Sequence, residues 1–162
     1  MNDVAYYIQN PALGSCLISE FVKGYCSASH QGTPMILSFI VLPFLFDSKC
    51  RSSLISCQRK KGIHNLLSKI NDDSKDNSIY LINERAKLLR TTSFDSIVVG
   101  VASLQIKMDV ENGLLFPDNA SAISVDIKSD SVTKMIKASY KFGEMLSPYS
   151  IAEISSFLKV RF

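Results

Sequence analysis

The sequence predicts a mainly α (α+β) protein, a compact helical domain with a small β-hairpin. Apolar residues recur at three- and four-residue steps through most of the chain, which is the spacing of one buried helical face. The segment 105–116 instead alternates apolar and polar residues around Asn112-Gly113, a dipeptide that favours tight hairpin turns. Hydrophobic residues make up 46% and charged residues 20% of the chain, a balance that excludes disorder as its main state.

The length of 162 residues predicts a single domain, 1–162. A chain of this size buries roughly two thirds of the surface that its unfolded form exposes, around one core. The mean hydropathy of +0.13 leaves two interpretations open, a rich core or an apolar surface that a partner covers.

The first helix is expected to begin at Asn10-Pro11, because asparagine caps helices and proline suits the first helical turn. It would end at Gln31-Gly32. Its predicted buried face consists of Leu13, Leu17, Phe21, Gly24, Tyr25 and Ala28.

Thr33-Pro34 repeats the helix-start signal, so the apolar segment 35–46 is expected to form a second, mostly buried helix. Its β-branched and aromatic residues leave a strand possible. The segment is too short for a membrane span, which needs roughly 20 residues, and Pro43 should bend or stop the helix.

Residues 47–61 are polar and basic, and they are expected to form a short exposed helix or a loop. A short helix at 63–70 and a loop at 71–77 follow, the loop being rich in asparagine and aspartate. A helix over 78–89 should carry the apolar stripe of Ile79, Ile82, Ala86 and Leu89.

Residues 91–93 can cap a further helix, and the hairpin strands 105–110 and 114–116 should follow it. A helix over 129–145 should stop before Pro148, and a last capped helix from Ser150 should run into 160–162, a terminal strand or packed tail. The predicted buried face of the helix after residue 91 consists of Phe94, Ile97, Val98, Val101 and Leu104.

The sequence contains no recognisable apparatus for catalysis or cofactor binding. Its seven glycines are too scattered for a phosphate-binding loop, and neither His30 nor His64 lies in a catalytic or metal-binding motif. We therefore expect no cofactor and no metal, and any ATP involved would be bound by another chain. Zinc is the weaker interpretation of the four cysteines, because their gaps lack paired ligand spacing. The start of the chain has no export signal, which predicts a cytoplasmic protein with free thiols.

The strongest charge feature is Arg59, Lys60 and Lys61, with Lys49 and Arg51 nearby. These side chains are candidates for contact with nucleic acid or an acidic partner, and the plain alternative is a solvated connector. The helices ahead of the hairpin also allow a winged-helix-like arrangement. However, the hairpin segment carries Lys107 against Asp109 and Glu111, so protein contact is at least as well supported as DNA reading.

Several short motifs follow one another over nearly the full chain. They are Asn10-Pro11-Ala12, then Leu42-Pro43 followed by Arg51 and Leu54, then Arg85-Ala86-Lys87, the hairpin 109–115 and Leu158-Lys159-Val160-Arg161. In this order they resemble the middle component of bacterial three-component ABC ATPase systems, a group that includes the small subunit of Lamassu-type antiphage defence. The chain departs from the pattern at Ile55, where proline is frequent, and at Lys159, where glycine is usual.

The resemblance implies a non-catalytic adaptor held between an SMC-like coiled-coil ATPase and an effector subunit, often a nuclease. Such systems sense foreign DNA and defend bacteria against phages or plasmids, so DNA could be contacted within the complex. The alternative function is a stand-alone winged-helix-like DNA-binding regulator.

Overall fold

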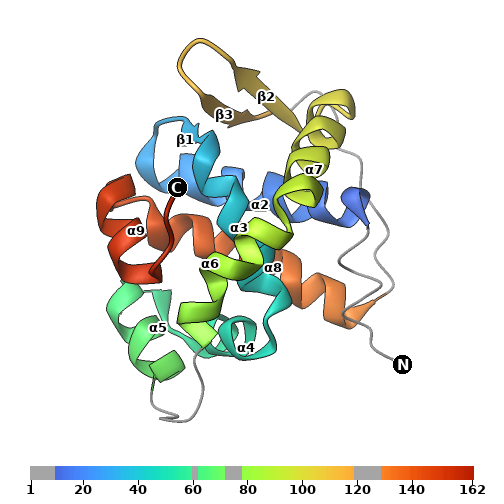
Figure 1. Cartoon of the computed structure of the whole chain (residues 1–162). Helices are drawn as coiled ribbons and strands as arrows, with labels where there is room; N and C mark the ends of the chain where they lie inside the picture. The colour runs from blue at the N-terminus through green and yellow to red at the C-terminus, as the bar shows by residue number, and fades with distance from the viewer. Residues whose placement is uncertain (1–9, 60–61, 72–77, 119–128) are drawn as a thin grey trace.

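The computed structural model describes residues 10–59, 62–71, 78–118 and 129–162. They form a mainly helical structure with one small antiparallel sheet, which confirms the predicted fold class (Figure 1). The helices are α2 (Pro11–Ser29), the 3-10 helix η1 (Met35–Leu37), α3 (Ser38–Phe46), α4 (Ser48–Ser56), α5 (Gly62–Asn71), α6 (Ser78–Leu88), α7 (Arg90–Ala102), α8 (Asp130–Leu146) and α9 (Ile151–Leu158). The strands are β1 (Thr33–Pro34), β2 (Ile106–Asp109) and β3 (Leu114–Pro117).

Helix α2 begins where the sequence predicts. The side chain of Asn10 accepts hydrogen bonds from the amides of Ala12 and Leu13, both at 3.1 Å, which satisfies two donors of the first turn. The helix ends at His30, which adopts the left-handed conformation with φ 56°. Ala28 is exposed in the last turn of α2, so its predicted place in the buried face is wrong.

The core forms where α2, α3 and α8 meet. The ring of Phe142 stacks on Phe44 of α3 at 4.3 Å between centroids and lies 5.6 Å from Phe21 of α2. The Ser139 hydroxyl donates a 2.6 Å hydrogen bond to the Leu17 carbonyl oxygen, which joins the backbones of α2 and α8 through a buried polar contact.

Glycines let α2 approach its neighbours at backbone distance. A methyl group at Gly24 would lie 2.0 Å from the Tyr140 carbonyl oxygen of α8, and one at Gly143 would lie 2.2 Å from the Phe21 carbonyl oxygen. On the other side of the helix, a methyl group at Gly14 would lie 2.0 Å from the Ser96 hydroxyl of α7. Because only glycine fits at these crossings, the sequence sets how closely the three helices pack.

The sheet has the order β1-β3-β2, with both pairs antiparallel. The predicted hairpin is confirmed, with Gly113 at φ 64° in its turn and Asp109 opposite Leu114. The sequence did not predict β1, because Thr33-Pro34 carries a helix-start signal and pairs with a distant segment, Thr33 lying opposite Leu115.

The apolar segment after β1 is helical, as expected. Helix α3 continues past Pro43 to Phe46, so the proline does not end the helix. Every residue of α3 is buried except Phe39, which is partly exposed. The expectation of an exposed segment at 47–61 is only partly right. Cys50, Leu54 and Cys57 are buried and fix one face of α4 to the core, while the opposite face is exposed.

The end of the chain packs against the helices as a tail. Val160 is buried, and its amide donates to the Ser155 carbonyl oxygen at 3.2 Å. The Arg161 amide donates to the Asn83 side chain of α6 at 3.1 Å, so the tail is held beside α6. Within the described ranges, none of the helices is long and apolar enough to cross a membrane.

Replacing Gly24 or Gly143 by Ala is expected to destabilise the protein by about 3 kcal/mol or more. Alanine favours a helix by about 1 kcal/mol over glycine, but here its methyl group would meet backbone atoms of the facing helix, which cannot move aside cheaply. Chemical denaturation measures the effect. Gly100→Ala is the matched control, because its methyl group meets only the end of the Ile106 side chain, at 2.8 Å. Equal stability of all three variants would contradict close helix packing.

Candidate protein-contact face

Helix α7 packs on α2 through small residues. Its buried positions are Ser93, Ser96, Ile97 and Gly100, of which only Ile97 is large. The predicted buried face is therefore wrong for Phe94, Val98 and Leu104, which are 52%, 49% and 52% exposed. The reason is the close approach of α7 to α2 at Ser96 and Gly14, which favours the helix face that carries mostly small residues and leaves Phe94 and Val98 on the outer face.

Large exposed apolar side chains concentrate in residues 80–110, which we call the contact segment. It includes seven of the eleven large hydrophobic residues that are exposed in the described part of the chain. These seven are Tyr80, Leu81, Leu88, Phe94, Val98, Leu104 and Val110. They come from α6, α7 and the hairpin, which makes this segment a candidate for protein contact.

Leu104 holds an unusual backbone conformation at the end of α7. It is 52% exposed and has φ 58°, in the left-handed region that disfavours branched side chains. A glycine would adopt this conformation without steric cost. The Gln105 amide donates to the Gly100 carbonyl oxygen at 2.9 Å, so Leu104 ends α7 in a left-handed capping turn.

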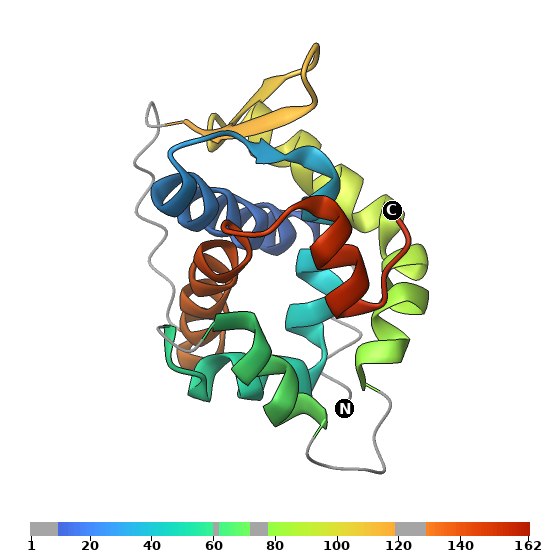
Figure 2. The ribbon, with the colours of Figure 1, turned by 90° about the vertical axis from the view of Figure 1, so that its left-hand side faces the viewer.

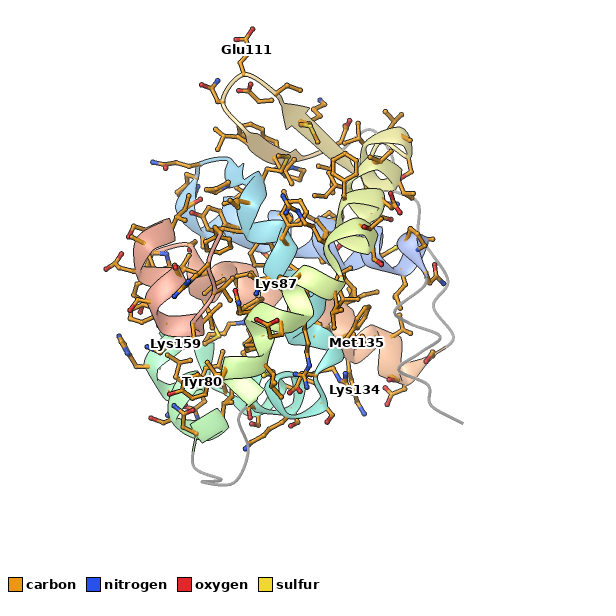
Figure 3. All side chains as sticks on the ribbon, viewed as in Figure 1. Tyr80, Lys87, Glu111, Lys134, Met135 and Lys159 are labelled. Carbon is orange, nitrogen blue, oxygen red and sulfur yellow. The ribbon has the colours of Figure 1, made fainter. Side chains whose placement is uncertain are left out.

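The charge of α7 and the hairpin does not match nucleic acid. The segment 90–117 contains two basic residues, Arg90 and Lys107. It contains three acidic ones, Asp95, Asp109 and Glu111. Lys107 lies 3.7 Å from the Asp118 carboxylate, and Figure 3 shows Glu111 at the tip of the hairpin. A hairpin that inserts into a DNA groove would need cationic side chains at this tip.

The turn of the hairpin is built by Asp109. Its carboxylate accepts from the Asn112 amide at 3.1 Å and from the Asn112 side chain at 2.8 Å. These hydrogen bonds stabilise the charged form and lower the pKa of Asp109 below its usual value. The Asp109 carboxylate therefore stabilises the turn and stays negatively charged.

The basic residues singled out in the sequence contact different helices: Arg59 contacts α8 and Arg51 contacts α3. Arg59 forms an ion pair with Glu144 of α8, 3.2 Å from Nε to the carboxylate, and its guanidinium lies 5.9 Å from the centre of the Tyr140 ring. Arg51 donates from Nη1 to the Leu45 carbonyl oxygen at 2.7 Å, toward α3. Lys49 is half-buried on α4, and Lys60 and Lys61 lie outside the described residues.

A feature that the sequence interpretation missed is Asp47, between α3 and α4. One carboxylate oxygen accepts from the Cys50 amide at 2.7 Å and so caps α4, and the other lies 2.5 Å from Nη1 of Arg85 on α6. The signal in the sequence was an aspartate directly before a helical segment. Burial alone would raise the pKa of Asp47, but the bonds from Cys50 and Arg85 outweigh it, and the pKa lies below its usual value.

The four cysteines are free thiols in the structure, with Cys50 and Cys57 buried. Burial raises the pKa of the Cys50 thiol, which keeps it protonated and unreactive. In the ranges that the structure describes, histidine, cysteine, aspartate and glutamate do not gather in a group of three that could hold a metal ion.

A helical domain with an apolar contact segment and a hairpin without excess positive charge is typical of a protein-binding subunit. Comparison with protein families shows the family of the chain. The model of ABC-three component (ABC-3C) system Middle Component 3 matches residues 1–162, and the chain belongs to this family. The resemblance found in the sequence motifs is thereby confirmed. No curated protein and no solved structure matches the chain.

Asp47→Asn should lower the stability by about 2 kcal/mol, because it removes a charged partner of Arg85 but retains a side chain that can cap α4. Asp47→Ala should cost about 1 kcal/mol more, since it also removes the cap. Denaturant unfolding of both variants separates the two contributions.

The same pair of variants tests the pH dependence. Because the pKa of Asp47 is lower in the folded protein, its contribution is present above the unfolded pKa of about 3.9 and is lost as the pH falls through the folded pKa. The stability difference between the wild-type protein and Asp47→Asn should therefore shrink below about pH 4. A difference that stays constant down to pH 2 would show that the carboxylate charge does not contribute.

Proposed function

We propose that this middle component is a non-catalytic adaptor that joins the ABC ATPase of its system to an effector subunit. The observation that supports it is the concentration of exposed apolar side chains in the contact segment, residues 80–110. Family membership supplies the assembly in which such a surface has a use.

The energetics of the contact segment favour a protein partner. Complete burial of a large apolar side chain gains about 1.5–3 kcal/mol, and Phe94, Val98 and Leu104 are each about half exposed. Covering them gains roughly half of that amount apiece, and Leu88, which is 81% exposed, gains more. A handful of such residues can act as the anchor of an interface.

The finer features of the proposal come from the family resemblance. The ATPase is an SMC-like coiled-coil protein, the effector is a nuclease, and the assembly acts in the bacterial cytoplasm against phage or plasmid DNA. The chain acts as one domain, which the shared buried cluster of residues from α2, α3, α6, α8 and α9 supports. ATP binding and catalysis belong to the partners, in keeping with a sequence that has no glycine-rich phosphate loop.

A stand-alone DNA-binding regulator is the second candidate. The hairpin directly after α7 favours it, and the acidic residues Asp95, Asp109 and Glu111 disfavour it. Such a regulator should bind duplex DNA in a salt-dependent way and lose affinity when Arg59, Lys60 and Lys61 are all replaced by Ala. The adaptor proposal expects no such loss in the isolated chain.

Phe94→Asp combined with Val98→Asp should weaken binding to the ABC ATPase component by at least 100-fold, because the two side chains lie one turn apart on the exposed side of α7 and charge there opposes burial. Copurification and interferometry with the purified ATPase measure the change.

The matched control is Ile55→Asp, which replaces a side chain of similar exposure, 44%, on α4. It should bind like the wild-type protein. All three positions are exposed, so the thermal midpoints should remain within a few degrees of each other. Full binding by the Phe94/Val98 variant would rule out α7 as the ATPase-binding surface.

A further inference from the structure

A groove lies between α6 and the last residues of the chain. Its cavity measures about 160 Å³, and its floor is formed by Ile36, Phe39 and Ile40, with Val160 on one wall. In Figure 2 the carboxyl-terminal residues run alongside the α6–α7 helices, which is the arrangement that forms this groove. The Asn83 bond to the Arg161 amide fixes the wall in place.

The rim of the groove is cationic. Lys87, Arg90 and Arg161 line it, and none of the side chains that line it is acidic. Lys87 pairs with Glu84 one turn away at 2.8 Å, which satisfies part of its charge. The carboxylate of a chain that ends at Phe162 would still leave a net positive charge at the groove.

The same chemistry is repeated on the other side of α6. A second cavity of about 530 Å³ is lined by the apolar side chains of Phe46, Leu88 and Leu89 together with Arg51 and Arg85. Figure 3 shows Tyr80 and Lys87 on α6, the helix that separates the two cavities. Asp47 already pairs with Arg85, so Arg51 is the further cation of this cavity.

We propose that the groove beside α6 binds an acidic, amphipathic segment of a protein partner, with a large apolar side chain in the cavity and carboxylates at Arg90 and Arg161. Charge complementarity selects acidic residues, and the apolar lining selects an apolar anchor. The apolar lining consists of Ile36, Phe39, Ile40, Ala86, Val160 and Phe162, which suits burial of a large apolar side chain.

This site goes beyond the adaptor function and does not depend on the side chains of Phe94 and Val98. An adaptor that joins two proteins needs two surfaces of different chemistry, and the groove supplies a charged one beside the apolar face of α7. Exposed ion pairs contribute only about 0.2–1 kcal/mol each, so the apolar anchor supplies most of the affinity and the arginines supply selectivity.

The test is a selection of random 12-residue peptides displayed on phage against the purified full-length chain, with counter-selection on the variant Arg90→Glu/Arg161→Glu. The enriched peptides should combine aspartate or glutamate with leucine, isoleucine or phenylalanine. Their synthetic forms should bind the wild-type chain and lose at least tenfold in affinity for the double variant, measured by fluorescence anisotropy. Binding should also weaken as the salt concentration rises.

The control variant is Lys134→Glu/Lys137→Glu, which changes the net charge equally on α8 and should leave peptide affinity unchanged. Glutamate at position 90 suits the first turn of α7, so folding should be retained, and circular dichroism checks this.

Enrichment of basic or uncharged peptides, no enrichment at all, or equal affinity for both double variants would overturn the proposal. Tighter binding of a duplex or single-stranded oligonucleotide, lost in Arg90→Glu/Arg161→Glu, would also overturn it. Binding by Phe94→Asp/Val98→Asp should be normal, which keeps this outcome separate from that of the ATPase-binding test.

Discussion

The contacts of α2 at backbone distance are the constraint from which the rest of the structure follows. Gly24 and Gly143 bring α2 against α8, and Gly14 brings it against Ser96 of α7. Helix α7 turns a mostly small face inward, with Ser93, Ser96 and Gly100 beside Ile97, and leaves Phe94 and Val98 outside. The exposed apolar surface is therefore a consequence of how tightly the core is packed.

Much of the fold follows from local rules in the sequence. The Asn10 cap, the capping box of Ser150 and Glu153, the helix at Ser78–Leu88 and the Asn112-Gly113 turn all rest on neighbouring residues. The face of α7 could not be predicted this way, because periodicity identifies an apolar stripe and not the element that covers it. The small residues on its other face are explained by distant segments, Ser96 by Gly14 of α2 and Gly100 by Ile106 of β2.

Tertiary contacts also determine which partners the basic side chains contact. Arg51 and Arg59 lie close in the sequence, yet one turns to the Leu45 carbonyl and the other pairs with Glu144 of α8. The cations that share a cavity with apolar side chains, Arg90 and Arg161, come from segments far apart in the chain. The chain is a middle component of an ABC-three component system, and its exposed apolar side chains concentrate in the contact segment, while cationic side chains gather beside α6 and not on the hairpin.

Hydroxyl-radical footprinting of the chain, alone and bound to its ABC ATPase, tests the central claim most directly because it reports side-chain exposure residue by residue. If the contact segment binds the ATPase, oxidation of Leu88, Phe94 and Val98 falls strongly in the complex, while that of Ile151, which is 41% exposed on α9, stays unchanged. Protection confined to α5, α8 or α9, with α7 as reactive as in the free chain, would contradict it.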